Sequence, residues 1–410
     1  MVSFSNRVMA VIRVGFTVIG GRQWTGGRNY LLNLLKALSA YERESIAPIV
    51  FAGQEVDRDE IREFAEIAGV EVVASGNWDG HRQLRATVNA LLLGRDPAIV
   101  RELRTHDIDV FFESARYLGW RPGVAAIGWI PDLQHRVLPD FFTRGLWLRR
   151  EFGIQMQIRS KRMVMLSSES ARRDFRRCYA AAHDRTRVVS FAVLGPATMD
   201  LVSARALADT YDLPRDYFFL PNQFWRHKNH LVVLEAIKVL KDRGNPVVVV
   251  VTGAGEDARA PGHFEQIMHR VQRESLGRYF RYLGLVPYEH LSLLMGASRA
   301  LVNPSLFEGW STTVEEARAH GVPMILSDLE VHHEQAGESA AYFDPHDPKS
   351  LADALERAYV PSDAERLRMA AIAREEANAR YKCFAKGFRE LCVEAVACAH
   401  PRRRAAGREE

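Results

Sequence analysis

The feature that most limits the possible folds is an alternation of short apolar segments and amphipathic segments, which runs along the chain twice. The first series extends from the apolar stretch 8–16 to 187–191, and the second starts at 217–220 and ends near residue 345. Strands that alternate with helices at this pitch form parallel sheets covered by helices on both faces. The 410 residues, 47% of them apolar, are enough for two such cores. The sequence therefore predicts an α/β protein with two doubly wound domains.

The break between the two series predicts the domain boundaries. We expect an N-terminal Rossmann-like domain over residues 1–195, a linker over 196–214, and a C-terminal Rossmann-like domain over 215–385. The last helical stretch, from Asp363 to about Cys398, is long enough to cross back onto the first domain. Residues 386–410 are therefore assigned to this crossing and to a charged tail.

Composition and charge narrow the class of protein further. The 55 basic and 51 acidic residues give a net charge of +4, too even a balance to indicate nucleic acid as the main partner. The four cysteines lack the spacing of zinc ligands and are interpreted as reduced thiols. Arg13 interrupts the first apolar stretch, which is therefore neither a signal peptide nor a membrane span. These features predict a cytoplasmic protein, with a peripheral position at the inner membrane face left open.

A loop and a helix start in the second half of the chain carry the clearest chemical signal. Glu308 lies in a loop after a predicted strand, and Thr313 and Glu316 have the spacing of a capping box, with Gly321 expected to end the helix. Free N–H groups at a helix start attract an anion. The two carboxylates could accept hydrogen bonds from a sugar and a ribose. The pattern fits a phosphorylated sugar, and it equally fits a capped surface helix beside an incidental glutamate.

Two loops that follow predicted strands could face the phosphates of such a ligand. Arg226 and Lys228 lie in a basic loop after the first strand of the second series, where they could neutralise a diphosphate. Gly26 and Gly27 precede the first helix of the chain, and no Walker motif follows them. Both loops also have a simpler interpretation, as a basic surface loop and as a glycine-rich turn without a ligand.

Three further patterns leave alternatives open. His135 follows the predicted strand 124–130, where open α/β sheets place ligand residues, although a lone histidine is more often structural. Asp107-Ile-Asp109 spells the D-x-D of metal-dependent sugar transferases, but it lies where a helix turns into a strand and is interpreted as structural. Residues 141–162 combine basic and aromatic side chains, which suits either an anionic membrane surface or a helix that packs its apolar face.

The run from Asn303 to Pro323 resembles the signature of family 4 retaining glycosyltransferases, with Glu308 and Glu316 on the two glutamates of its E-x7-E pattern. The usual Gly-Phe-Gly-Leu is replaced by Gly309, Trp310, Ser311 and Thr312. The resemblance implies a GT-B fold, in which two Rossmann-like domains face a central cleft, and it implies no metal and no cofactor. The residues that it implies for catalysis are His135, Lys228 and Glu308. Those that it implies for donor binding are Gly26, Gly27, Asn222, Arg226, Gly284, Leu285, Val286, Gly309, Trp310, Ser311, Thr312, Thr313 and Glu316.

In particular, Lys228 would bind the diphosphate, and Asn222 stands near the place where the family usually has an arginine. The resemblance thus predicts a retaining glycosyltransferase that moves a sugar from a nucleoside-diphosphate sugar onto a sugar, lipid-linked or other hydroxyl acceptor in polysaccharide or glycoconjugate synthesis. UDP- and GDP-linked donors both stay open, as do the acceptor, the linkage and the oligomeric state. A nucleotide-sugar epimerase of the same fold and a non-catalytic sugar-nucleotide-binding module are the alternatives.

Overall fold

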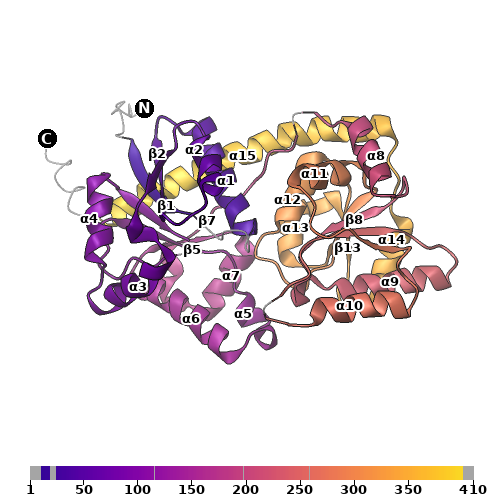
Figure 1. Ribbon diagram of the computed structural model, residues 1–410, viewed down its shortest axis with the longest axis horizontal. Helices are drawn as coiled ribbons and strands as arrows, with labels where there is room; N and C mark the ends of the chain where they lie inside the picture. Colours follow the sequence, from indigo (N-terminus) through magenta and orange to yellow (C-terminus); the bar gives the residue numbers. More distant parts are fainter. Residues whose placement is uncertain (1–10, 19–24, 115, 197, 258, 400–410) are drawn as a thin grey trace, which may run out of the picture.

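The computed structural model describes residues 11–18, 25–114, 116–196, 198–257 and 259–399. These residues form two α/β domains placed side by side (Figure 1). The first contains a seven-stranded parallel sheet with the strand order β3-β2-β1-β4-β5-β6-β7. Its strands are β1 (Ile12–Thr17), β2 (Ile46–Ala52), β3 (Glu71–Ala74), β4 (Val110–Glu113), β5 (Ala125–Ile130), β6 (Met163–Leu166) and β7 (Thr186–Val188).

The helices of the first domain cover both faces of this sheet, as the nearly uninterrupted apolar strands require. They are α1 (Thr25–Tyr41), α2 (Arg58–Ala65), α3 (Gln83–Leu92), α4 (Pro97–Thr105), α5 (Gln134–Val137), α6 (Arg144–Arg159) and α7 (Glu169–Cys178). One face packs against α1. The opposite face packs against α3 and α4, and farther along against α6 and α7.

The second domain repeats the plan with a six-stranded parallel sheet in the order β10-β9-β8-β11-β12-β13. Its strands are β8 (Phe218–Pro221), β9 (Val249–Thr252), β10 (Phe280–Tyr282), β11 (Ala300–Asn303), β12 (Met324–Ser327) and β13 (Ala340–Phe343). Its helices are α8 (Leu201–Thr210), α9 (His230–Asp242), α10 (His263–Arg273), α11 (Tyr288–Ala297), α12 (Thr312–His320), α13 (Glu330–Ala336) and α14 (Pro348–Arg357). The prediction of two doubly wound domains is confirmed.

The predicted linker contains α8, which packs with the second domain. Ala208 and Leu213 belong to the same buried cluster as Leu294 of α11 and Phe219 of β8. The second domain therefore recruits a helix that precedes its first strand, because α8 supplies apolar side chains that cover one face of the sheet.

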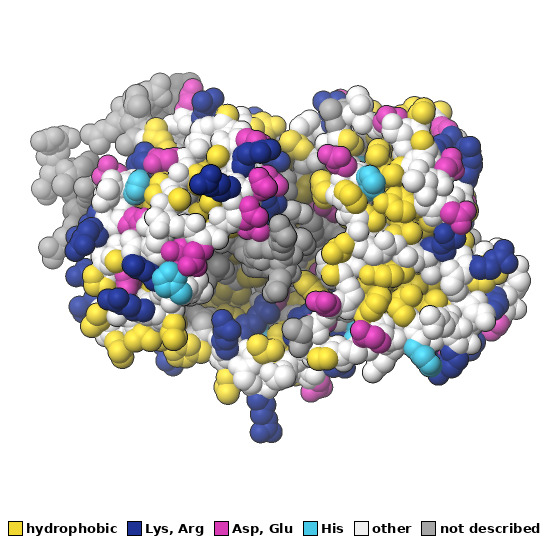
Figure 2. All heavy atoms as spheres, in the orientation of Figure 1, with side chains coloured by type: hydrophobic (Ala, Val, Ile, Leu, Met, Phe, Trp, Pro, Cys, Tyr) yellow, Lys and Arg dark blue, Asp and Glu magenta, His cyan; other side chains and the backbone are white. Residues whose placement is uncertain are grey.

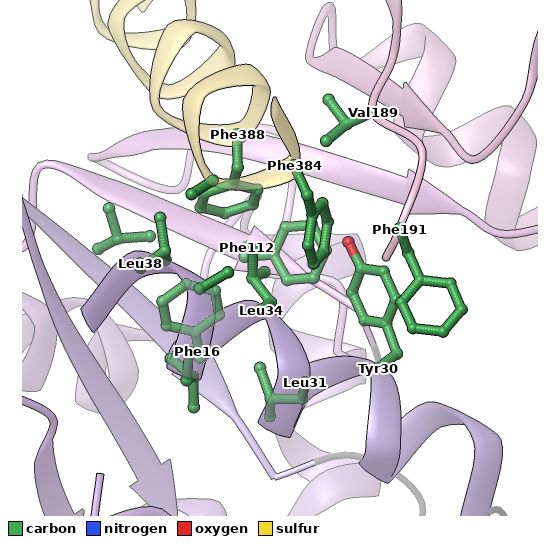
Figure 3. Close-up of a cluster of buried hydrophobic side chains, with 14 of the residues drawn as sticks. Phe16, Tyr30, Leu31, Leu34, Leu38, Phe112, Val189, Phe191, Phe384 and Phe388 are labelled. Atoms are coloured by element: carbon green, nitrogen blue, oxygen red, sulfur yellow. The ribbon is translucent and has the colours of Figure 1, made fainter. Parts of the chain in front are cut away.

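The helix α15 (Asp363–Ala399) joins both domains along its 37 residues (Figure 1). Its buried side chains, Ala377, Tyr381, Phe384 and Phe388 among them, follow a helical repeat and belong to the first core. Figure 3 shows Phe384 and Phe388 facing Phe112 and the side chains of α1. Tyr381 also donates a hydrogen bond to Asn33 O at 2.8 Å. Tyr381 precedes residue 386, so the helix reaches the first domain before the predicted start of the crossing segment. Among the described residues, no helix is both long and apolar enough to cross a bilayer.

Candidate active site

The two loops that carry the predicted catalytic pair meet at the carboxyl edge of the second sheet. β8 and β11 are adjacent strands, so the loops that follow them lie next to each other. Leu306 N in the second loop donates to His227 O in the first at 2.7 Å. Lys228 Nζ lies 2.6 Å from Glu308 Oε1. The structure therefore brings together a cation and a carboxylate that are 80 residues apart in the sequence.

The pair is largely buried, with 12% of the Lys228 side chain and 8% of the Glu308 side chain exposed. Burial raises the pKa of Glu308, but Lys228, His332 and the hydroxyl of Ser305 outweigh burial and leave the pKa below its ordinary value. Ser305 Oγ donates to Glu308 Oε1 at 2.8 Å. Glu308 is therefore a fixed, ionised acceptor of hydrogen bonds.

The helix start beside this pair differs from the predicted one. The predicted capping box is wrong, because α12 already begins at Thr312, so that both Thr313 and Glu316 lie inside the helix. Ser311 occupies the N-cap position, and Asn303 Nδ2 donates to Ser311 Oγ at 2.9 Å and to Thr313 Oγ1 at 3.4 Å. The predicted end of the helix is confirmed, since Gly321 has a left-handed φ of 68°.

Glu316 and its neighbour Glu315 have opposite electrostatic surroundings. Burial raises the pKa of Glu316 to about 7, although a hydrogen bond from Tyr288 partly opposes the shift. Glu315 instead lies 2.6 Å from an Arg318 nitrogen and accepts from Gln335 Nε2 at 3.2 Å, which anchors α12. Glu316, which is 5% exposed, thus differs from Glu315 in having no cationic partner among the described residues.

The loop before α12 touches the first domain. A Cβ on Gly309 would lie 2.2 Å from Pro131 O and 2.7 Å from the Cβ of Asp132, so only glycine fits. Trp310 Nε1 donates to Phe191 O at 2.8 Å. Ser311 N, also buried, donates to Gln335 Oε1 at 3.0 Å. The structure thus uses Trp310 and Ser311 to hold the loop, whereas the resemblance implied contacts with a donor.

Two arginines outside the predicted set act on His227, the residue before Lys228. Arg259 follows β9, donates to Asp257 Oδ1 at 3.0 Å and also donates to Gln134 Oε1 of the first domain at 3.3 Å. Arg150 of α6 lies 2.5 Å from Asp132 Oδ1. Burial lowers the pKa of His227 well below its ordinary value, and Lys228, Arg259 and Arg150 lower it further. Three cations from three elements therefore converge around one neutral imidazole.

The other residues of the basic loop have distinct positions. Asn222, at the end of β8, is 3% exposed, and its Nδ2 has no hydrogen-bond partner within the described ranges. Arg226 is exposed, and its guanidinium lies 4.4 Å from the ring centre of Phe141 in the first domain. A cation–π contact of this kind joins the two domains. Asn222 offers an unsatisfied donor at the strand end, while Arg226 lies farther out.

The loop after β10 presents backbone and one apolar side chain. Gly284 has a left-handed φ of 77°, and its carbonyl accepts from Gly253 N at 3.0 Å. Leu285 is 70% exposed, and Val286 is half-buried. These three residues lie at the same carboxyl edge of the sheet as Lys228, on the side of β9 and β10.

His135 lies deeper than the sequence suggests. The imidazole is fully buried, and Nε2 lies 3.2 Å from Glu151 Oε2, which also accepts from Tyr179 and Arg136. Burial lowers the pKa of His135, although the Glu151 hydrogen bond opposes it. Its Nδ1 has no partner among the residues that the structure describes. Asp132, at the same strand end and against Gly309, is the more accessible polar group.

The remaining predicted features fall elsewhere. Gly26 and Gly27 form part of the first turn of α1, one turn earlier than expected, and the glycines at 20 and 21 lie outside the described residues. Asp109 Oδ2 accepts from Arg13 N at 2.9 Å at the amino end of β4, which supports the structural interpretation of the D-x-D sequence. In residues 141–162, Trp147 Nε1 donates to His135 O, so this aromatic side chain packs within the first domain.

One group of residues in the described part of the chain has the composition of a metal site. Glu55, Asp79 and His81 offer ligand atoms within 4.8 Å of one another, after β2 and β3. His81 Nδ1 lies 3.2 Å from Glu55 Oε1, and Asp79 Oδ1 accepts from Glu55 N at 3.2 Å. The group contacts itself through these bonds and lies at the β2–β3 edge of the first sheet, separated from β5 by β1 and β4.

Sequence reasoning missed Arg259, Arg150, Asp132 and His332. Arg259 follows Gly253-Ala-Gly255, which has the pattern of an incomplete dinucleotide loop but still delivers a cation to the domain interface. His332 of α13 is buried beside Glu308, and its Nδ1 lies 2.9 Å from Ser327 O. No motif marks either residue, since both reach the site through tertiary packing.

Two facing Rossmann-like domains, joined by a terminal helix that crosses back, constitute the GT-B fold. Two solved structures share it over most of their length. A glycosyltransferase from Rickettsia africae ESF-5 has a TM-score of 0.68 at 13% identity, covering 94% of this chain and 99% of that one. Anabaena HepE, in complex with UDP and glucose, has a TM-score of 0.66 at 15% identity, covering 93% and 100%.

The family match from sequence comparison lies in the second domain. The family model of glycosyl transferases group 1 matches residues 215–360. The O-antigen chain mannosyltransferase RfbU of Salmonella typhimurium is 25% identical over 226 residues, which are 55% of this chain and 58% of that protein. The chain therefore spans just over half the length of this relative.

Proposed function

We propose that the protein is a retaining glycosyltransferase that moves a sugar from a nucleoside-diphosphate donor to a hydroxyl acceptor. The observation that carries this proposal is the contact between Lys228 and Glu308 beside the start of α12, at the interface of two Rossmann-like domains. The match of residues 215–360 to glycosyl transferases group 1 supports it.

The departing diphosphate needs positive charge that is already in place. Lys228 and Arg259 supply it, together with the N–H groups at the start of α12. Because Lys228 already faces Glu308, a bound phosphate shares this cation with the carboxylate. The free Nδ2 of Asn222 offers a neutral donor where the family usually has an arginine.

The sugar and ribose need fixed acceptors. Glu308 is ionised and accepts hydrogen bonds from sugar hydroxyls near the reacting carbon, while Glu316 accepts from the ribose. The leaving phosphate takes the proton of the acceptor, so that the acceptor attacks on the face from which the diphosphate leaves. Contacts between the domains, such as those of Gly309 and Trp310, exclude water from the donor.

The names of the relatives narrow the substrates. RfbU is an O-antigen chain mannosyltransferase, and HepE was solved with UDP and glucose. We therefore expect a hexosyl donor carrying UDP or GDP and an acceptor within a surface polysaccharide, free or lipid-linked. The reaction uses neither metal nor other cofactor and takes place on the cytoplasmic side, at the inner membrane face where the acceptor is lipid-linked.

The experiment incubates the full chain with UDP-glucose, UDP-galactose, GDP-mannose and GDP-fucose, with and without sugar acceptors, with EDTA or added Mg²⁺. Transfer that is unaffected by EDTA, with the anomeric configuration retained in the product by NMR, is the expected result. An isomerised donor without acceptor would identify an epimerase. Tight nucleotide binding without turnover with any acceptor would identify a binding module, and a metal requirement would refute the metal-free mechanism.

A further inference from the structure

The helix α3 has its apolar side chains on the wrong side for a helix of a globular domain. Its buried residues are Ala86 and Ala90. Leu84, Val88 and Leu92 are instead 76%, 43% and 75% exposed. Their spacing of four residues places them in one row along the helix. A surface helix normally buries its large apolar side chains, so this row lacks a partner within the described chain.

The apolar surface continues past the end of the helix. Leu93 is 59% exposed, and Trp120 is 42% exposed. Trp120 Nε1 donates to Leu91 O at 3.4 Å, and a Cβ on Gly94 would lie 2.8 Å from its ring, so the indole is packed over the helix end. We call the surface formed by Leu84, Val88, Leu92, Leu93 and Trp120 the α3 patch.

Positive charge borders this patch. Residues 80–95 contain no aspartate or glutamate, and the next acid, Asp96, is buried and accepts from Asn89 Nδ2. The exposed Arg85, Arg95 and Arg121 form no ion pair within the part of the chain that the structure describes. Figure 2 shows basic and hydrophobic side chains next to one another at the lower edge of the first lobe, where Figure 1 places α3.

We propose that the α3 patch docks on an anionic lipid bilayer. Leucine and tryptophan side chains enter the boundary between headgroups and acyl chains, while the bordering arginines contact lipid phosphates. A symmetric dimer through the same patch would bring one arginine-bearing border against the same border of the second copy. Residues 80–95 carry arginines and no acid, so they need a negatively charged partner. An anionic bilayer supplies both this charge and an apolar interior. The inference does not depend on the proposed reaction.

The test is co-sedimentation of the full chain with vesicles of phosphatidylcholine alone or with 30% phosphatidylglycerol, with the oligomeric state measured separately by light scattering. One variant, Leu84→Ser with Leu92→Ser, removes apolar area, and another, Arg85→Gln with Arg121→Gln, removes charge. The matched controls are Val202→Ser, which is 81% exposed on α8, and Arg357→Gln, exposed on α14. Thermal unfolding of each variant verifies the fold.

We expect binding to the anionic vesicles only, weakened about tenfold by the serine variant and about fivefold for each arginine replaced, with both controls unchanged. High salt should weaken binding of the wild type. Failure of the wild type to bind anionic vesicles would overturn the proposal. So would equal binding of the serine variant, or a wild-type dimer in solution that the serine variant dissociates.

Discussion

The two sides of the domain interface are built differently. On the side of the second domain, the proposed ligand groups come from loops that directly follow β8 and β11, and Lys228 lies 2.6 Å from Glu308. On the side of the first domain, polar groups after β5 are held by other side chains, as Asp132 is by Arg150 and His135 by Glu151. In the second domain, Lys228 and Glu308 could each exchange the other for a ligand. In the first domain, the ion pairs hold the loop after β5 in one position.

This difference assigns separate roles to the two domains. The buried pair of Lys228 and Glu308 has the catalytic role that we propose, because Lys228 can bind a phosphate in addition to Glu308. Burial raises the pKa of Glu151, but hydrogen bonds with Arg136, Tyr179, Gln155 and His135 outweigh it and lower the pKa to about 2. This network has a structural role, because it holds the segment after β5 in place. Replacing one group on each side should therefore change different measurements.

The largest expected effect comes from the second-domain pair. Lys228→Ala should lower the rate of transfer by about 100- to 1,000-fold, because the diphosphate loses its nearest cation. It should also lower the free energy of unfolding by about 3 kcal/mol, because Glu308 is left buried and unpaired. Single-turnover kinetics and urea denaturation measure the two effects.

The double variant Lys228→Met with Glu308→Gln separates them. It should recover most of the free energy of unfolding without recovering transfer, since neither side chain is then an unpaired charge. Lys238→Ala, exposed on α9, is the matched control. Wild-type turnover by either pair variant would remove these residues from the reaction.

A somewhat smaller effect concerns Glu316 and pH. Its pKa is about 7 in the folded protein and about 4.5 when unfolded. The folded state therefore binds more protons between these values, and stability that is present below pH 4.5 is lost as pH rises through 7. Glu316→Gln should remove this loss, amounting to as much as about 3 kcal/mol at pH 8.

Urea denaturation at pH 5 and pH 8 measures the change, with Glu338→Gln, exposed in the turn before β13, as control. In the wild type, nucleotide affinity should rise through pH 7 as Glu316 ionises and accepts from the ribose. A parallel pH dependence of stability in variant and wild type would contradict the assignment.

The same contrast explains what the sequence could predict. The strands and helices of both domains follow from local periodicity. Lys228 and Glu308 could be predicted to meet, because loops that follow adjacent parallel strands lie at the same edge of the sheet. Trp310 and Ser311 lie in the right loop, but packing against Phe191 and Gln335 directs them away from the expected role. His135 and Arg259 depend on contacts between segments more than 15 residues apart, which no local pattern encodes.

The contact between the two sides gives the third prediction. Gly309→Ala places a methyl group 2.2 Å from Pro131 O, so the loop before α12 must move away from the first domain. We expect a loss of about 1–3 kcal/mol in the free energy of unfolding and an increased radius of gyration in small-angle X-ray scattering. Gly277→Ala, with no atom within 4 Å of its added Cβ, is the control. Unchanged scattering and stability would show that the two domains do not press on each other at Gly309.

The smallest effect compares one arginine from each side. Arg259→Gln should weaken nucleoside-diphosphate binding about tenfold, since a cation near Lys228 is lost while glutamine keeps a donor for Asp257. Arg150→Gln should change this affinity less than threefold, because Arg150 extends from α6 of the first domain, whereas the diphosphate is proposed to lie against the second. Titration calorimetry with UDP and GDP measures both, with Arg273→Gln on α10 as the exposed control. If Arg150→Gln weakened binding more than Arg259→Gln, the diphosphate would lie against the first domain and the division between the two sides would be reversed.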